Sequence, residues 1–421
     1  LFDTIIKHAD PYPDLNDQPL QLQISALAYD DYIGRLGIGR VTQGIVKAGS
    51  VVDVAKGDGS IEQKKINQVF VYRGLKRMAV DQAESGDIVV ISGISDISIG
   101  ETICDPADPM PLEMIHIEEP TLSMYFMVNK SPFAGKVGKF VTSRHIKERL
   151  SKELEVNVGL KVEETDSTDS FKVSGRGELH LSILIENMRR EGYELAVSKP
   201  EVIMRRGDKG QLLEPLEEVV LSVPDEYTGS VISKLNLRKG LMQEMKSENG
   251  FTRLEYLVPT RGLLGYRSEF INDTRGEGTM VRRLSHFGEF VGEIPQRTNG
   301  VAIAQEEGVA TPYAIFNISE RVQMFIEPGT RVYEGMIIGM NARSDDMVVN
   351  PCKAKKATNM RAAGSDDNIK LAPAKTFTLE EALEFINDDE LVEIVPDDIR
   401  LRKKYLKELE RRRLGRKVKT E

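Results

Sequence analysis

Short β-type runs separated by glycines fill the first hundred residues, and this pattern constrains the fold more than any other feature of the sequence. The runs are predicted at Gln21–Ala28, Gly39–Val46, Ser50–Val54, Lys65–Val71 and Asp87–Ser92. No helical period lies between them. Short strands at close spacing are typical of a small closed β-barrel. Pro106, Pro109 and Pro111 then indicate a linker.

Two later segments predict the same order of elements. In residues 118–200, strands are predicted at Thr121–Val128, Leu160–Glu164, Ser170–Ser174 and Tyr193–Val197. A helix is predicted from Ser143, between the first two strands, and another at Glu178–Arg190, before the last strand. Residues 214–290 repeat that order at Leu216–Val223, Tyr227–Arg238, Leu241–Lys246, Arg253–Val258, Arg261–Asn272 and Thr279–His286. The order β-α-β-β-α-β is the split βαβ plan, so we expect two ferredoxin-like domains.

The remaining residues predict a mixed, β-rich C-terminal domain that also contains a helix. Strands are expected at Val301–Gln305, Thr311–Ile318, Arg331–Tyr333 and Met336–Met340. Thr378 and Glu381 have capping-box spacing for the helix. A chain of 421 residues with only 6% aromatic residues is expected to divide into several small cores. We therefore predict a multidomain α+β protein.

Five segments are expected. Residues 1–19 precede a β-barrel at 20–112, ferredoxin-like domains at 113–200 and 201–292, and a C-terminal domain at 293–421. Residues 1–8 have the pattern of the end of a helix, and Pro11 and Pro13 stop it. Because the first residue is Leu1, we expect the chain to have been cut from a longer protein; natural N-terminal processing is the alternative.

Sequence motifs for catalysis are missing. Residues 131–140 contain two Gly-Lys pairs, but both lack the following Ser or Thr and the correctly placed first Gly of a nucleotide-binding P-loop. The five His residues show no metal-ligand spacing. Cys104 and Cys352 lie too far apart for a disulfide framework. We expect no catalytic, cofactor-binding or metal-binding residue here, and a reducing, cytoplasmic setting.

Positive charge is concentrated near the C-terminus. The net charge is −9, but eleven Lys/Arg and three Glu give residues 400–421 a charge of +8, which leaves −17 for residues 1–399. Residues 350–364 carry four cations and no acid, with Asn and Thr but few bulky apolar residues. Such a segment cannot form a core and offers charges and donors to an RNA backbone. An ordinary surface loop and a solvated tail are the alternatives.

Several stretches resemble translation factors. Residues 31–49, with Gly34-Arg35-Leu36-Gly37-Ile38-Gly39-Arg40-Val41, resemble their second, β-barrel domain. Residues 133–144 and 174–181 resemble the third domain of the elongation factor G group, and residues 214–217 and 227–240 resemble the fifth. Residues 349–364, with Lys355-Lys356-Ala357-Thr358-Asn359-Met360-Arg361-Ala362, resemble the C-terminal domain of the BipA/TypA family.

The resemblance implies a translational GTPase whose GTPase domain, with GTP and magnesium, precedes Leu1. It also implies binding to the ribosome, with roles in large-subunit assembly and stress-dependent translation, and a monomer. The partners implied are ribosomal RNA and the acceptor end of tRNA, and the residues expected to bind RNA are Lys353, Lys355, Lys356, Thr358, Asn359 and Arg361. Lys136, Lys139 and Arg343 are weaker candidates. The alternative is a scaffold that contacts ribosomal proteins or its own GTPase domain without touching RNA.

Overall fold

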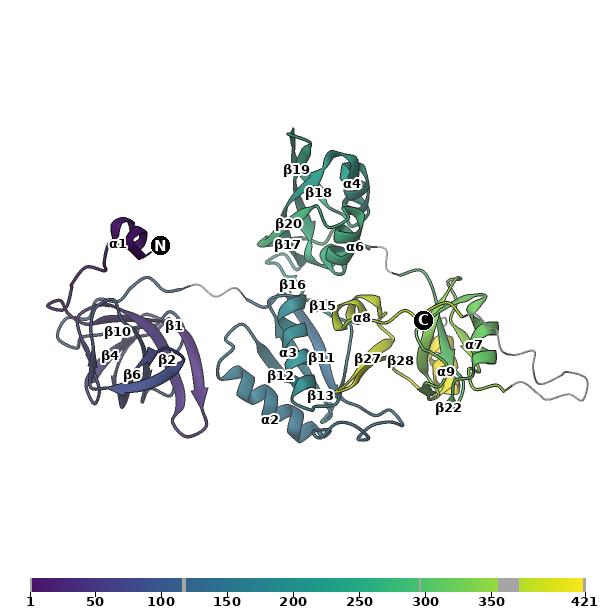
Figure 1. Ribbon diagram of the computed structural model, residues 1–421, viewed down its shortest axis with the longest axis horizontal. Helices are drawn as coiled ribbons and strands as arrows, with labels where there is room; N and C mark the ends of the chain where they lie inside the picture. Colours follow the sequence, from purple (N-terminus) through teal and green to yellow (C-terminus); the bar gives the residue numbers. More distant parts are fainter. Residues whose placement is uncertain (1, 116–118, 295–296, 355–370, 419–421) are drawn as a thin grey trace, which may run out of the picture. The chain divides into compact units, whose positions relative to one another are not determined.

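The computed structural model describes residues 2–115, 119–294, 297–354 and 371–418. The chain forms two compact units, residues 1–119 with 148–161 and residues 120–147 with 162–421. The short helix α1 (Phe2–His8) begins the first unit (Figure 1). No helix of the described residues is long and apolar enough to cross a membrane.

The first unit contains one antiparallel sheet. Its strands, in the order in which they pair, are β5 (Ile61–Lys65), β4 (Val51–Ala55), β10 (Thr102–Cys104), β1 (Gln21–Asp30), β2 (Gly34–Gln43), β9 (Ile88–Ser92), β6 (Gln68–Arg73) and β7 (Lys76–Val80). A small separate pair consists of β3 (Val46–Lys47) and β8 (Gln82–Ala83). The predicted run 39–46 is divided between β2 and β3, because Gly44 turns the chain with φ of 73°.

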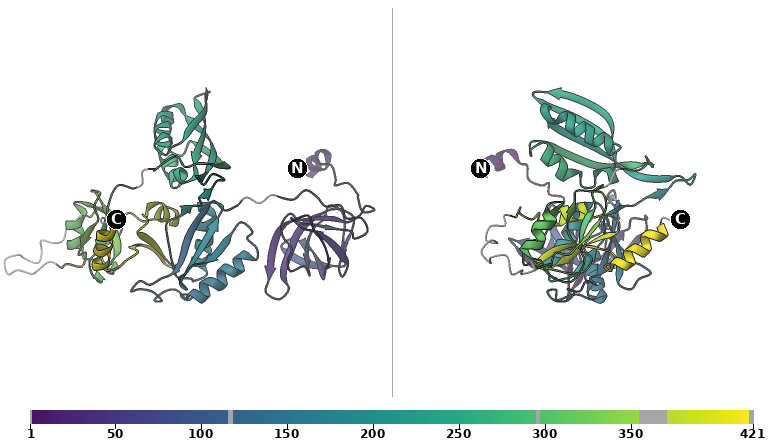
Figure 2. Two further views of the ribbon diagram at one scale, coloured as in Figure 1. Left: turned by 180° about the vertical axis from the view of Figure 1, so that it is seen from behind. Right: turned by 90° about the vertical axis from the view of Figure 1, so that its right-hand side faces the viewer.

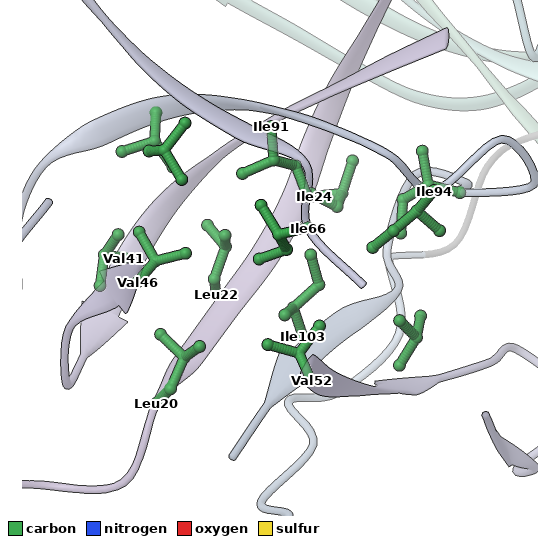
Figure 3. Packing of buried hydrophobic residues seen from close by; sticks show 14 of the residues in the cluster. Leu20, Leu22, Ile24, Val41, Val46, Val52, Ile66, Ile91, Ile94 and Ile103 are labelled. Carbon is green, nitrogen blue, oxygen red and sulfur yellow. The ribbon is translucent and has the colours of Figure 1, made fainter. Parts of the chain in front are cut away.

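Side chains from both halves of this sheet pack into one core. Leu22, Ile24, Val52, Ile91 and Ile103 are almost fully buried there (Figure 3). Within residues 2–115, however, no described pairing joins the edge strands β5 and β7. The β-rich unit is therefore observed, whereas closure into a barrel stays a prediction.

The second unit begins with the predicted order β-α-β-β-α-β. Its elements are β11 (Leu122–Val128), α2 (Ser143–Leu154, whose last residues group with the first unit), β12 (Lys161–Glu164), β13 (Ser170–Gly175), α3 (Glu178–Arg190) and β14 (Leu195–Val197). The strands pair in the order β12-β13-β11-β14. Helix α2 begins at Ser143 and is capped by the preceding residue, Thr142, whose hydroxyl accepts from the amide of His145. Short strands β15 (Glu201–Val202) and β16 (Arg205–Arg206) follow.

The same order recurs in the next segment. It contains β17 (Leu212–Pro224), the 3-10 turn η1 (Asp225–Tyr227), α4 (Thr228–Leu237), β18 (Leu241–Glu248), β19 (Phe251–Pro259), α5 (Thr260–Leu263), α6 (Tyr266–Asp273) and β20 (Thr279–Glu289). Strands β17, β19 and β18 pair in that order, and β20 pairs with β17. Val231 and Leu235 of α4 and Tyr266 and Phe270 of α6 share one core with the sheet. Figure 2 shows the ribbon from two further sides. The single helix predicted at 261–272 is divided at Gly265, which is left-handed.

The C-terminal residues continue the first of these two sheets. The elements are β21 (Val301–Ala304), β22 (Gly308–Val309), α7 (Pro312–Ser319), β23 (Val322–Met324), β24 (Arg331–Val332), β25 (Met336–Asn341), β26 (Met347–Val349), α8 (Leu379–Phe385), β27 (Glu390–Val395), β28 (Asp398–Lys403) and α9 (Glu408–Val418). Strand β27 pairs with β14, and the sheet runs on through β28, β25, β21 and β26. Figure 1 shows β27 and β28 in yellow.

One predicted strand is wrong: the segment Thr311–Ile318 falls on the cap and the body of helix α7. Thr311 caps this helix, because its hydroxyl accepts from the amide of Ala314 at 3.2 Å, and Pro312 occupies the first turn, where a missing N–H costs nothing. The apolar side chains of this segment suggested alternation, but the cap and the proline decide the local structure. The capping box predicted at Thr378 and Glu381 is confirmed.

Candidate RNA-binding site

Residues 350–364, the basic segment, begin in a turn that is fixed by hydrogen bonds. The Thr311 hydroxyl donates to the carbonyl of Lys353 at 2.8 Å, and the Thr311 amide donates to the carbonyl of Pro351 at 2.9 Å. The Asn350 side chain accepts from the amide of Cys352 and donates to Glu306 at 2.7 Å. The chain is thus fixed up to Lys353.

Lys353 itself is exposed, and among the described residues it forms no ion pair. An unpaired surface cation is available to a phosphate. The other expected RNA-binding residues, Lys355, Lys356, Thr358, Asn359 and Arg361, lie outside the described residues. Their role stays a prediction from the sequence.

The loop that resembled a P-loop binds a carboxylate of the protein itself. The amides of Gly135 and Gly138 donate to the buried carboxylate of Glu194, at 3.1 and 3.3 Å. Gly135 has φ of 74°, and a Cβ on Gly138 would lie 2.5 Å from the Cβ of Glu194. Glycine is therefore required at both positions to close the loop on Glu194, and these amides are not free for a nucleotide phosphate.

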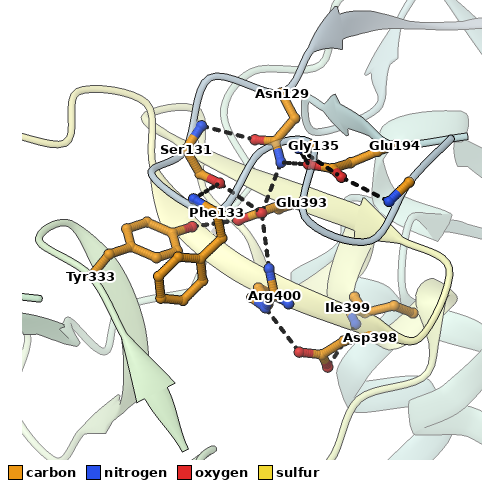
Figure 4. A network of polar contacts seen from close by, with 11 residues as sticks. Asn129, Ser131, Phe133, Gly135, Glu194, Tyr333, Glu393, Asp398, Ile399 and Arg400 are labelled. Carbon is orange, nitrogen blue, oxygen red and sulfur yellow. Dashed lines mark hydrogen bonds and ion pairs between the residues drawn. The ribbon is translucent and has the colours of Figure 1, made fainter. Parts of the chain in front are cut away.

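A buried polar network ties this loop to the C-terminal hairpin (Figure 4). The Asn129 amide group donates to Glu194 at 2.7 Å and to Glu393 of β27 at 2.8 Å. Ser131 and Arg400 also donate to Glu393, at 2.8 and 3.1 Å, as does the Tyr333 hydroxyl. Burial and the Glu393 carboxylate raise the pKa of Tyr333, so this hydroxyl stays a donor. Both carboxylates in the network have partners, as buried charges require.

The network brings one weaker candidate, Lys136, to the core of the C-terminal domain. The Lys136 ammonium lies 4.3 Å from the centroid of the Phe133 ring, and Phe133 packs edge-on against Tyr333. Arg331 lies over the same ring at 5.4 Å. Phe133 belongs to the cluster against which Cys352, the neighbour of Lys353, also packs. Lys136 and Arg331 thus lie at the edge of the core against which Cys352 packs.

Arg331 is a further surface cation near this core that the sequence does not predict. Its side chain is 63% exposed, with Glu307 at 3.6 Å as its ion-pair partner. Exposed ion pairs of this kind contribute little stability, so Arg331 can exchange its partner for a phosphate. The sequence offers no signal for it, because only the pairing of β24 with β22 places it near the root of the basic segment.

The remaining two weaker candidates lie apart. The Lys139 side chain lies along Gly192, at the end of α3, and its amide donates to the Gly192 carbonyl at 2.8 Å. Arg343 is exposed in the turn after β25, where its carbonyl accepts from Gly300. No contact between described residues joins either of them to Lys353.

Three protein-family models match the chain. They are the TypA/BipA C-terminal domain at residues 299–408, the elongation factor G C-terminus at 211–298 and elongation factor Tu domain 2 at 34–104. The large ribosomal subunit assembly factor BipA of Bacillus subtilis (strain 168) is 48% identical over 422 residues, which span 100% of this chain and 69% of that protein. The chain belongs to the TypA/BipA family.

A second relative agrees with this assignment. The large ribosomal subunit assembly factor BipA of Salmonella typhimurium is 49% identical over 424 residues, which span 100% of this chain and 70% of that protein. A crystal structure of a protein from Thermus thermophilus matches with a TM-score of 0.46 and 17% identity, over 69% of this chain and 58% of that one. Because its TM-score is low, this structure carries no weight in the family assignment. The basic segment lies inside the region matched by the TypA/BipA C-terminal domain.

Proposed function

We propose that this chain is the ribosome-binding region of a large-subunit assembly factor, and that residues 350–364 bind ribosomal RNA and tRNA. The observation that carries the proposal is a run of four cations without a carboxylate, starting from a turn fixed by Thr311 and Asn350. Membership of the BipA family supports the ribosome as the target. The acidic remainder of the chain favours a single orientation on a polyanion.

The wider activities that the resemblance implies belong to the whole protein. We propose for it GTP hydrolysis with magnesium, a role in stress-dependent translation and a cytoplasmic location. In this chain, the folded part positions the RNA-binding residues. The sheet that runs from β12 to β26 holds the start of the basic segment, and its cations neutralise phosphates.

Cross-linking distinguishes RNA binding from the scaffold alternative. A photoreactive residue in place of Lys355 is expected to cross-link to RNA in ribosomes, and the same residue in place of Lys209, an exposed lysine of another domain, serves as the control. RNA cross-links from position 355 in excess of those from position 209 support the proposal. Cross-links to ribosomal proteins alone would favour the scaffold.

A further inference from the structure

A cavity of about 760 Å³ lies in the second unit, and Lys353 is not among the residues that line it. Its walls are the C-terminal end of α3, residues 325–330, the segment 374–380 and the start of β28. The segment 374–380 follows the basic segment in the same domain and is fixed by the Lys375 amide, which donates to the Met324 carbonyl at 2.8 Å. Neither the network around Glu393 nor the basic segment gives this cavity a role.

Aromatic rings form one wall. Phe325 and Phe377 line the cavity, are half-buried, and contact each other edge-on with centroids 4.7 Å apart. Phe385 contacts both rings, at 5.3 and 5.2 Å, but does not line the cavity. A rigid cluster of this kind presents ring faces to a flat apolar ligand at low entropic cost.

Cations stand beside this wall. The Lys375 ammonium lies 4.7 Å from the Phe377 centroid on an exposed side chain. Arg190, 75% exposed, lines the cavity from α3, with Glu186 as its ion-pair partner at 2.7 Å. Arg189 is instead fixed by Glu186 and by the carbonyl of Pro396, and Arg400 is held in the buried network around Glu393. Lys375 and Arg190 are therefore the two lining cations with freedom to move to a phosphate.

The acidic side chains limit what the cavity can hold. Glu186 and Asp398 are ion-paired, and Glu327, Glu380 and Asp397 also line the walls. Five carboxylates against four cations disfavour a polyanion such as a triphosphate. They suit a ligand with one phosphate that donates hydrogen bonds, and a ribonucleotide does so through its exocyclic amine and its 2′-hydroxyl.

We propose that this cavity binds an unpaired nucleotide of RNA. The base stacks on Phe377, and Lys375 leaves the ring to pair with the phosphate together with Arg190. Wall carboxylates accept from the base amine and the ribose. The proposal rests on the proposed function, because RNA bound by residues 350–364 supplies the strand. Stacking of bases on aromatic side chains combined with basic side chains is the usual chemistry of single-strand binding.

The absence of tryptophan from the chain allows a direct test. In Phe377→Trp the new side chain is the sole tryptophan, and its fluorescence is expected to be quenched when an unpaired oligoadenylate is added. Phe385→Trp is the matched control, because that ring touches Phe377 but does not line the cavity. Quenching in Phe377→Trp and not in Phe385→Trp supports the proposal. No quenching in Phe377→Trp, or equal quenching in both variants, overturns it.

Affinity gives a second readout that does not depend on tryptophan. Phe377→Leu keeps an apolar side chain and is expected to weaken oligoadenylate binding by about tenfold. Lys375→Ala with Arg190→Ala should weaken it as well, whereas deoxy-oligoadenylate should bind less tightly than the ribo form. Unchanged affinity in Phe377→Leu, or equally tight binding of free AMP, would contradict an RNA site.

The failure of this inference is distinguishable from failure of the proposed function. Ribosome binding that is lost on replacing the cations of residues 350–364, with no oligoadenylate effect at Phe377, refutes the cavity alone. Ribosome binding unaffected by those replacements refutes the proposed function and, with it, the source of the strand.

Discussion

At the scale of single residues, two buried carboxylates fix the loop that carries the basic residue Lys136. Glu194 and Glu393 are both fully buried, and one amide group, that of Asn129, donates to each of them. A buried charge without a partner lowers the stability of the fold, so each hydrogen-bond donor to these carboxylates contributes to stability. These polar side chains position the loop that carries Lys136.

Replacing Asn129 tests this network. Asn129→Ala removes two hydrogen bonds to buried carboxylates, and we expect it to lower the free energy of unfolding by about 3 kcal/mol. Ser131→Ala removes one bond to Glu393 and should cost less. Asn236→Ala, at an exposed position of α4, should change stability little. Denaturant unfolding measures all three, and equal stability of Asn129→Ala and the native chain would refute the network.

A third carboxyl, that of Glu178, makes stability depend on pH. Burial raises the pKa of Glu178 to about 7, while Arg282 opposes this shift and Glu384 and Glu217 add to it. The folded chain thus holds a proton that the unfolded chain releases near pH 4.5. Stability falls as the pH rises from about 4.5 to 7, by on the order of 3 kcal/mol at most.

Glu178→Gln should remove that fall and make the protein more stable at about pH 8. Glu186→Gln, on the same helix, is the control with the opposite sign. Arg189 lowers the pKa of Glu186 to about 2, so this group stabilises the fold above about pH 4.5 and its contribution is lost on acidification. Thermal unfolding across about pH 2 to 8 separates the two, because the pKa values of both groups lie in that range. A Glu178→Gln profile identical to the native one would disprove the assignment.

At the scale of elements, helix α7 connects capping to the proposed RNA site. Thr311 caps the helix and also holds the carbonyl of Lys353. Its amide donates to the carbonyl of Pro351 as well. One residue therefore stabilises α7 and fixes the root of the basic segment.

Thr311→Ala is expected to cost about 1 kcal/mol of stability through the lost cap. It should also loosen the turn at Lys353 and reduce RNA cross-linking from that position. Thr311→Ser keeps the hydroxyl and should preserve both. A Thr311→Ala variant that loses stability but keeps full cross-linking would show that the turn needs no such anchor.

At the scale of the whole molecule, local sequence patterns predicted the element order but not the long-range pairing. The βαββαβ orders follow from apolar periodicity, and both are observed. The pairing of β14 with β27 joins residues about two hundred positions apart, and no local pattern encodes it. All six residues of β27 are buried, so both faces of this strand are covered, and Glu390 and Glu393, which point to opposite faces, both lie inside.

The candidate site likewise combines features that the sequence predicts with features that only the folded structure shows. Residues 350–364 are predicted from composition alone, because a segment with four cations and few apolar residues cannot form a core. The glycines at 135 and 138 do not fit the P-loop pattern in the sequence, and the partner of their amides, Glu194, is visible only in three dimensions. Arg331 likewise reaches the site only through strand pairing.

The central claim, that the cations of residues 350–364 neutralise RNA phosphates, is tested most directly by the salt dependence of ribosome binding. Replacing Lys353, Lys355, Lys356 and Arg361 with Ala should reduce the log–log salt slope by roughly 3, at about 0.7–0.9 per phosphate contact. Replacing four exposed lysines elsewhere, Lys7, Lys47, Lys65 and Lys209, is the control and should leave the slope nearly unchanged. A slope in the first variant equal to that of the native chain would contradict the account.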